Sequence, residues 1–423
     1  MKSDDMDELS DVPCVQIDKS NVATCWNYLT DCLQRAHFVA IDLELSGLGN
    51  KAQLKVTDVE ERYKNISYIA RTRSILSIGL SFFRDAYNAK EDSPPSPWKF
   101  EAINFNIITT CSDDYVLEDD ARDFLTSYGF DFEKQKNHGL PYARGRQADN
   151  EDEHSIRKII SMINRKLPII FHNGLIDLIF LYENFMENLP KTMTTFIANL
   201  NELFPNGIFD TKYIACNFLS VENSYLAYLF YKSQRDNLMD KYRGQPYITV
   251  SFPTNPQLSD HIDHHCLQTR ILQEREGVSL CKDYMTYGWC KKLNNCNHSH
   301  EVDLILDQEK KSKKQKKILN KLKESESSKE DNDSQDANME DKKVESSIHR
   351  AGYDAFMTGY CFFCLIVKIL QGKMNQHGKA LLIARELRNY RNSIHLTGKK
   401  EPFKVRKSSY TQPTVKLDTS TAI

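Results

Sequence analysis

The chain has 423 residues, of which 40% are hydrophobic and 10% aromatic, a balance typical of a soluble globular protein with room for one large domain or two ordinary ones. Its formal net charge of −2 excludes a globally basic surface, so any contact with a nucleic acid must come from local patches or from bound metal ions. The first twenty residues are acidic and lack the pattern of a signal peptide, so we expect the eleven cysteines to be thiols in a reducing compartment.

The hydrophobic pattern predicts an α/β protein. In the first half we expect a helix that starts near Val22, a strand covered on both faces at 38–43, a helix at 60–73, and strands at 74–82 and 103–107. Further along we expect a helix around 156–163, a short strand at 168–171, a helix at 176–186 and a strand at 208–213 that turns into a helix. Strands followed by alternating strands and helices predict a mixed sheet flanked by helices.

The composition changes abruptly near Glu309. Residues 308–343 are dominated by charged and polar side chains that cannot bury enough apolar surface to fold, so we expect a disordered linker. At its head, the basic run Lys310–Lys317 favours a nuclear localisation signal over a merely solvated linker. Apolar periodicity returns at 348–370. Its most apolar part, Ala355–Leu370, carries Lys368 and is too short for a comfortable membrane span of about 20 residues, so we expect a buried helix. Residues 408–423 are expected to be a flexible tail.

Asp42 and Glu44 form the first informative pair of carboxylates. Residues two apart on a strand point to the same face, so both acids project together at the end of an apolar strand. An isolated pair of this kind is more often a strand end that reaches solvent.

Two further acids stand at the starts of apolar helices. Asp177 follows Asn173 by four residues, and a carboxylate in this position has either a metal-binding role or a favourable interaction with the helix dipole. Asp354 follows His349 by five residues and opens the last apolar helix, where Gly352 allows close packing. His349 alone is more often a surface or capping histidine.

Together these residues fit phosphodiester hydrolysis. Two divalent cations about 4 Å apart stabilise the attacking and leaving oxygens of such a reaction, and Mg²⁺ prefers carboxylate oxygens. A histidine with a pKa near neutrality is suited to take a proton from the attacking water. The set comprises Asp42, Glu44, Asp177, His349 and Asp354.

This ordered set resembles the histidine-bearing branch of the DEDD exonuclease superfamily, which has a ribonuclease H-like fold. The first motif, with Ser46 and Gly47 after the acid pair, is similar to the poly(A)-specific ribonuclease family in particular. The resemblance implies that Asp42, Glu44 and Asp354 hold the Mg²⁺ or Mn²⁺ that activates water. It also implies that Asp42 bridges to a second ion supported by Asp177, and that His349 is the general base. Asp210, in a stretch that is also similar to this group, is assigned no catalytic part.

A second constellation predicts a structural zinc site. The spacing C-x8-C-x5-C-x3-H supplies three thiolates and an imidazole for tetrahedral Zn²⁺, with His298 as a weaker competitor for the fourth position. The predicted ligands are Cys281, Cys290, Cys296 and His300.

This segment looks like a CCCH zinc finger, a module that commonly stacks single-stranded RNA bases on aromatic side chains. Its candidate RNA contacts are Tyr284, Tyr287, Trp289, Lys282, Lys291 and Lys292.

A finger between the second and third acidic motifs narrows the resemblance to the Target-of-EGR type of nuclear deadenylase. The resemblance implies removal of adenosine tails and short extensions from the 3′ ends of small nuclear and other non-coding RNAs, in nucleoli and Cajal bodies. We expect a catalytic domain in two blocks, 15–263 and 344–407, with the finger at 275–303 between them and no membrane association. Two rivals remain open, namely a catalytically silent RNA-binding scaffold and a DNA-trimming exonuclease of the same fold.

Overall fold

A computed structural model describes residues 9–86, 98–145, 154–219, 221, 223–269, 278–311, 349–370 and 385–415. Most of the predicted linker, including most of its basic run, lies outside the described residues.

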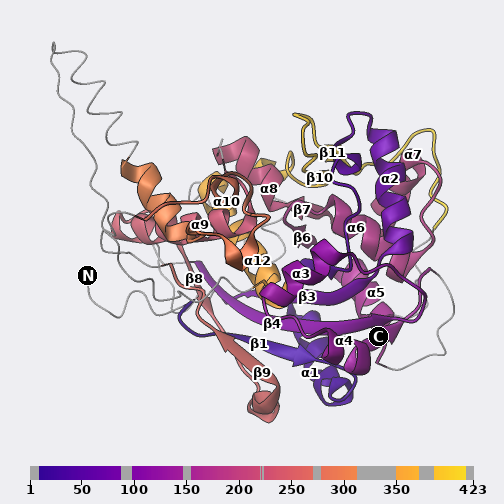
Figure 1. Ribbon diagram of the computed structural model, residues 1–423, viewed down its shortest axis with the longest axis horizontal. Coiled ribbons are helices and arrows are strands. Elements are labelled where there is room, and N and C mark those ends of the chain that lie inside the picture. Colours follow the sequence, from indigo (N-terminus) through magenta and orange to yellow (C-terminus); the bar gives the residue numbers. More distant parts are fainter. Residues whose placement is uncertain are drawn as a thin grey trace.

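A large mixed sheet forms the centre of the molecule (Figure 1). Its strand order is β11-β10-β7-β6-β2-β3-β4-β1-β9, and β5 and β8 also pair with β4. The central strands are β2 (Phe38–Leu45), β3 (Ile75–Asp85), β4 (Trp98–Cys111), β1 (Val12–Ile17) and β6 (Ile169–Phe171). The shorter strands are β5 (Leu140–Tyr142), β7 (Ile208–Asp210), β8 (Ile248–Ser251), β9 (Ile262–His265), β10 (Ser393–Ile394) and β11 (Phe403–Lys404).

Strand β2 separates two hydrophobic cores because its side chains alternate between the faces of the sheet. Val39 and Ile41 enter one core, and Phe38 and Ala40 enter the other. The first core is covered by α1 (Val22–Arg35), α2 (Val59–Thr72), α5 (Ile156–Lys166), α6 (Leu175–Leu181) and α7 (Met193–Leu203). The second is covered by α8 (Thr211–Ile214), α9 (Leu226–Tyr242) and α12 (Ala351–Leu370). The predicted fold class, a ribonuclease H-like mixed sheet flanked by helices, is confirmed.

Helix α12 lies almost entirely inside the fold. By length and composition it is the one described helix that could cross a membrane, but 89% of its most apolar window is buried in the protein, as expected for a core helix. Phe363 stacks on Phe100 with ring centroids 3.7 Å apart. Two glycines permit the close contact: a Cβ at Gly79 would lie 1.8 Å from the Ala351 carbonyl oxygen, and one at Gly359 would lie 2.1 Å from the Phe83 ring. The segment that follows the linker therefore completes the core of the first block.

Two boundaries differ from the sequence predictions. Residues 302–311 are helical, so the predicted linker begins inside a helix whose Ile305 and Leu306 are buried. The predicted tail is also fixed in part, because the Thr414 N–H donates to Asn199 Oδ1 at 2.8 Å and Val415 is buried. The polar composition of both segments did not indicate these contacts, because each contact depends on a partner far away in the sequence.

Candidate active site

Asp42, Glu44 and Asp354 converge at the C-terminal end of β2. The alternation that places Phe38 and Ala40 toward α12 also turns the two even-numbered acids toward that helix. Asp354 lies in the first turn of α12. One carboxylate oxygen from each of the three residues lies within 4.8 Å of the others.

The start of α12 is held in place by a row of polar side chains that crosses the sheet. The Gly352 N–H donates to Asn106 Oδ1 at 3.3 Å, and the Ser77 hydroxyl donates to the same oxygen at 3.0 Å. The amide nitrogen of Asn106 donates to Gln16 Oε1 at 3.0 Å. These residues position Asp354. The sequence carried no signal for them, because they lie on three different strands, β1, β3 and β4, which only the folded sheet brings together.

Asp177 approaches the same site from the first turn of α6. It lies outside the group of three that meets within 4.8 Å, but its charge raises the pKa values of both Asp42 and Glu44. All four predicted carboxylates therefore belong to one electrostatic cluster.

Asp210 fixes the turn that precedes Asp177. Its fully buried carboxylate accepts five backbone N–H groups, which come from Asn173, Gly174, Lys212, Tyr213 and His395 at 2.9–3.2 Å. Asn173 has a φ of +63°, a left-handed conformation that Asn tolerates better than most residues. The structure thus gives Asp210 a structural part in the site.

His349 contacts both Asp354 and an aromatic wall. Its Nδ1 lies 3.4 Å from Asp354 Oδ2, and its ring packs against Tyr128 and Phe124 with centroid distances of 4.4 and 5.4 Å. Burial by itself lowers the pKa of His349, but the neighbouring Asp354 carboxylate outweighs burial and raises the pKa above 6.5. The two aromatic residues lie on helix α3 (Asp119–Ser127) and just after it, and no sequence pattern indicated their contact with His349.

Burial and mutual repulsion make the acids of the cluster hard to ionise together. Burial followed by the charge of Asp354 raises the pKa of Glu44 to about 7. Burial also raises the pKa of Asp177 to about 7, and that of Asp42 well above its ordinary value. Like charges in a buried site need a cation to remain ionised at neutral pH.

The residues present fit divalent metal ions. Asp354 Oδ1 is buried and has no hydrogen-bond partner among the residues that the structure describes. An unpartnered carboxylate oxygen beside two other carboxylates provides the hard ligands that Mg²⁺ and Mn²⁺ prefer. Asp42, Glu44 and Asp354 would hold one ion, and Asp42 with Asp177 would support a second.

The four predicted zinc ligands also meet in space. One ligand atom from each of Cys281, Cys290, Cys296 and His300 lies within 4.8 Å of the others. His300 Nε2 is buried without a hydrogen-bond partner in the described part of the chain, which suits a nitrogen that faces a metal ion. His298 stands apart from this group, and its Nδ1 lies 2.9 Å from the Ser279 hydroxyl.

The predicted RNA contacts of this segment divide into three classes. The prediction for Tyr284 is wrong: the side chain is 2% exposed because its ring stacks on His300, so it offers no face to a base. One face of Trp289 is covered by Lys51, whose Nζ lies 3.4 Å from the ring centroid. Tyr287, by contrast, is 68% exposed. The three predicted lysines of this segment, Lys282, Lys291 and Lys292, are exposed as well.

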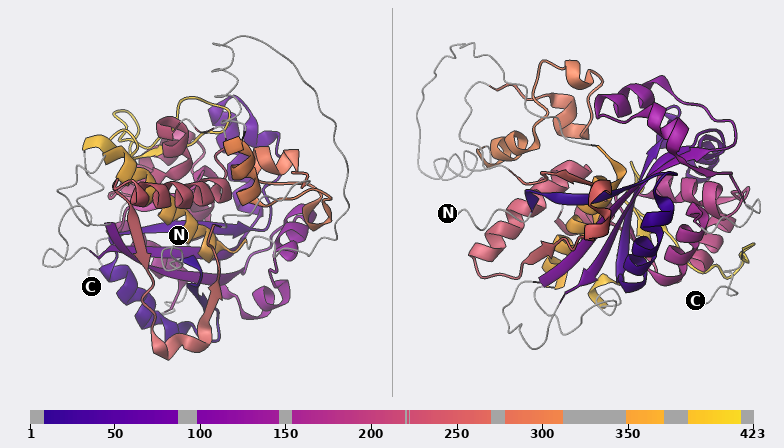
Figure 2. Two further views of the ribbon diagram at one scale, coloured as in Figure 1. Left: turned by 90° about the vertical axis from the view of Figure 1, so that its left-hand side faces the viewer. Right: turned by 90° about the horizontal axis from the view of Figure 1, so that it is seen from below.

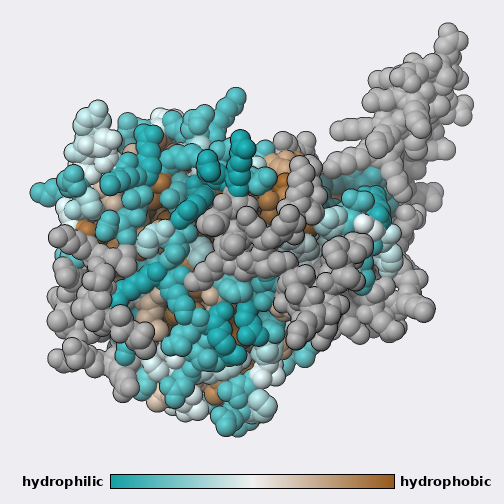
Figure 3. Space-filling model, turned by 180° about the vertical axis from the view of Figure 1, so that it is seen from behind, coloured by the Kyte–Doolittle hydropathy of each residue, from teal (hydrophilic) through white to brown (hydrophobic). Residues whose placement is uncertain are grey.

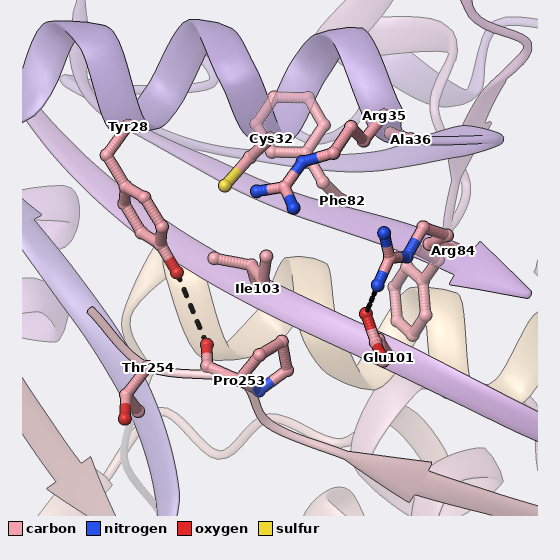
Figure 4. Close-up of a pocket in the computed structure, with 11 residues that line it drawn as sticks. Tyr28, Cys32, Arg35, Ala36, Phe82, Arg84, Glu101, Ile103, Pro253 and Thr254 are labelled. Carbon is pink, nitrogen blue, oxygen red and sulfur yellow. Dashed lines mark hydrogen bonds and ion pairs between the residues drawn. The ribbon is translucent and has the colours of Figure 1, made fainter. Parts of the chain in front are cut away.

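Two of the cavities in the described part of the chain bear on the choice of site. One of about 320 Å³ adjoins the acidic cluster and is lined by Glu44, Ser77, Asn106, Phe130, Lys134 and Arg350 among others. The other, of about 250 Å³, lies between α1, β3 and β4 and is lined by none of the predicted site residues (Figure 4). Its Arg84 is paired with Glu101, and Tyr28 donates to the Pro253 carbonyl oxygen at 3.3 Å. The first cavity is therefore the one that belongs to the candidate site.

Comparisons with known proteins identify similar sequences. The family described as CAF1 family ribonuclease matches residues 17–161 and 146–362. The poly(A)-specific ribonuclease PARN of Xenopus laevis is 21% identical over 402 residues, which cover 83% of this chain and 62% of that protein. The pre-piRNA 3′-exonuclease trimmer of Bombyx mori is 48% identical over 50 residues, 12% of this chain and 9% of that protein. The chain thus spans less than two thirds of either relative.

Among solved structures, the Mg²⁺- and Mn²⁺-bound form of Pop2p from S. pombe is 18% identical, with a TM-score of 0.37 over 54% of this chain and 82% of that chain.

Proposed function

Because the chain belongs to the CAF1 ribonuclease family, we propose that it is a divalent-metal-dependent 3′-to-5′ exoribonuclease that shortens adenosine tails. The observation that carries the proposal is the convergence of Asp42, Glu44 and Asp354 within 4.8 Å, with His349 at 3.4 Å from Asp354. A chain that had lost the chemistry would have no reason to keep these mutually repelling acids in one buried site.

The side chains have distinct parts in this proposal. The four carboxylates hold the metal ions, which when bound neutralise charge on the phosphate and lower the pKa of the attacking water. Asp354 faces Nδ1 of His349 and so orients the ring, which leaves Nε2 to take a proton from water. Phe124 and Tyr128 restrict the ring from the other side.

The preference for adenosine tails is supported by likeness alone. One relative carries the name poly(A)-specific ribonuclease, and the motifs of this chain resemble the Target-of-EGR type of deadenylase. We therefore propose maturation of small nuclear and other non-coding RNA 3′ ends as the biological task. Nuclear localisation, with nucleoli and Cajal bodies as the compartments, is part of the same proposal and rests on the basic run Lys310–Lys317 together with this resemblance.

We also propose that Cys281, Cys290, Cys296 and His300 bind one structural Zn²⁺ and form a CCCH finger. The support is the four-ligand group and the unpartnered, buried Nε2 of His300. Tyr287 and the three exposed lysines remain the candidates for RNA contacts.

The test uses labelled oligo(A), oligo(U) and oligo(dA) with Mg²⁺, and the Asp42→Ala variant as control. We expect the wild-type protein to shorten oligo(A) from the 3′ end and the variant to leave it intact. Equal shortening by both would reveal a contaminant. Preferred shortening of oligo(dA) would instead support a DNA exonuclease, and binding without shortening would support the silent scaffold.

A further inference from the structure

The Cys3His module, residues 278–300, docks firmly on helix α9. The aromatic ring of Tyr225 lies 2.4 Å from the point where a Cβ on Gly288 would stand, so the backbone of the module touches this ring directly. The helical residues 302–311 continue the contact, because buried Arg235 of α9 pairs with buried Asp303 at 2.9 Å. A buried ion pair requires good geometry, so the helical segment that follows the module is held firmly on α9.

The module also contacts the loop that carries Lys51 and the C-terminal end of α3. Trp289 packs under the Lys51 ammonium group at 3.4 Å, and the Asn294 side chain donates to the Ser127 carbonyl oxygen at 3.0 Å. Lys51 follows the first acidic motif by seven residues, and Ser127 is the last residue of α3. Figure 2 (right) shows the orange module beside the purple helices that follow the long strands.

Helix α3 connects this contact to the reacting groups. At its start, the Glu118 carboxylate accepts the N–H groups of Leu48 and Gly49 and pairs with Arg73 at 2.6 Å, so it fixes the loop after Asp42 and Glu44. At its end, Phe124 and Tyr128 pack against His349. The helix thus stands between the module and two of the motifs.

Helix α3 has little core of its own. Of its nine residues only Leu125 is buried, so few apolar contacts hold it on the sheet. A helix of this length is marginal without tertiary support. The module supplies that support at the end of the helix that carries the wall for His349.

We propose that the Cys3His module is a positioning element for catalysis: Trp289 and Asn294 hold the Lys51 loop and α3, and through Phe124 and Tyr128 they hold His349 in place. The proposal rests on the proposed nuclease function and assigns the module a task that does not require contact with RNA. The competing role for Trp289 is base stacking. Its face toward Lys51 is already occupied, which favours the positioning role.

The experiment compares two substrates of very different length, oligo(A) of about twenty nucleotides and 5′-phosphorylated diadenylate, with Mg²⁺ and the full chain. The variants are Trp289→Ala, Trp289→Phe and Asn294→Ala, and the matched control is Asn295→Ala, whose exposed side chain lies in the same turn. A positioning role predicts that kcat falls roughly tenfold on both substrates in Trp289→Ala, with KM nearly unchanged. Trp289→Phe keeps an aromatic face for Lys51 and restores most of the rate.

Three further readouts separate positioning from unfolding. Zinc content and thermal unfolding show that each variant is intact, and Asn294→Ala, which removes one exposed hydrogen bond, keeps the test open if Trp289→Ala does not fold. Amide hydrogen exchange in residues 119–128 is expected to speed up in Trp289→Ala and in Asn294→Ala, but not in the Asn295→Ala control.

The outcomes are distinct. A loss confined to the longer substrate and expressed as a higher KM would overturn the proposal in favour of RNA stacking. Unchanged kinetics and exchange would show that the contacts of Trp289 with Lys51 and of Asn294 with Ser127 have no role in catalysis. An inactive wild-type protein would refute the nuclease function itself. An active wild-type protein whose variants behave like it would refute only this inference.

Discussion

The clearest test of how the site is built is Asp210→Asn. The wild-type carboxylate is fully buried, and its oxygens accept five N–H groups from three separate segments, including Asn173, Gly174 and His395. One oxygen accepts three of these groups and the other accepts two. An amide keeps the shape of the side chain but replaces one oxygen with an NH₂ group, which must face at least two donors.

The magnitude follows from the lost bonds. Each hydrogen bond to a charged group contributes about 1.5–3 kcal/mol, so two of them predict a loss of about 3–6 kcal/mol in the free energy of unfolding. In thermal unfolding we expect a melting temperature lower by roughly 3–7 °C. Because Asn173 and Gly174 form the turn before Asp177, we also expect RNA shortening to slow by roughly tenfold or more in the folded variant.

The matched control is Asp58→Asn, which makes the same chemical change at the exposed N-cap of α2. Asp58 accepts one N–H, from Glu61 at 2.7 Å, and Asn caps helices about as well as Asp. This control is expected to change stability by no more than about 0.5 kcal/mol. If Asp210→Asn had the same melting temperature as the control, the five N–H groups would not require a carboxylate as acceptor. The explanation given for the Asn173 turn would then be wrong.

Three further predictions concern the metal ions. Without metal, Glu44→Gln should stabilise the protein at pH 8 by up to about 3 kcal/mol, because a pKa raised from 4.5 to about 7 costs about 1.4 kcal/mol per pH unit. The same variant should no longer shorten RNA. A melting temperature below that of the wild-type protein in EDTA would contradict this prediction. In the metal-free wild-type protein, Glu44 and Asp177 should contribute most to stability below about pH 4, and this contribution should be lost as the pH rises toward 7, because folding raises the pKa of both groups. Melting temperatures in EDTA and in Mg²⁺ should therefore diverge with rising pH. A constant difference between them would count against a shared metal site. A fragment that ends at Asp263 should neither shorten RNA nor respond to Mg²⁺ in thermal unfolding, because it lacks Asp354; activity in that fragment would refute the two-block catalytic domain.

The periodicity of the sequence was enough to place the main elements. Alternation along β2 correctly put Asp42 and Glu44 on one face, and apolar spacing predicted the buried helix that carries Asp354. Family resemblance then proposed which distant acids meet. Periodicity alone could not do so, because the meeting depends on how α6 and α12 pack on the sheet.

The residues that support the site were beyond the reach of sequence patterns. Asn106 and Tyr128 act through partners more than 200 residues away, at Gly352 and His349, and such pairs leave no local signal. Tyr284 was misassigned for a related reason. Aromatic residues between metal ligands serve either RNA or the interior of the module, and only packing against His300 shows which.

The central position of α12 has a consequence for biosynthesis. A ribosome completes every strand from β1 to β9 before this helix emerges, so the nascent chain leaves Phe38, Phe83 and Phe100 without the cover that Phe363 later supplies. We expect such an intermediate to be prone to aggregation, because its apolar surface is exposed. It also lacks Asp354, so under the proposed mechanism the nascent chain gains nuclease activity only after this helix has emerged.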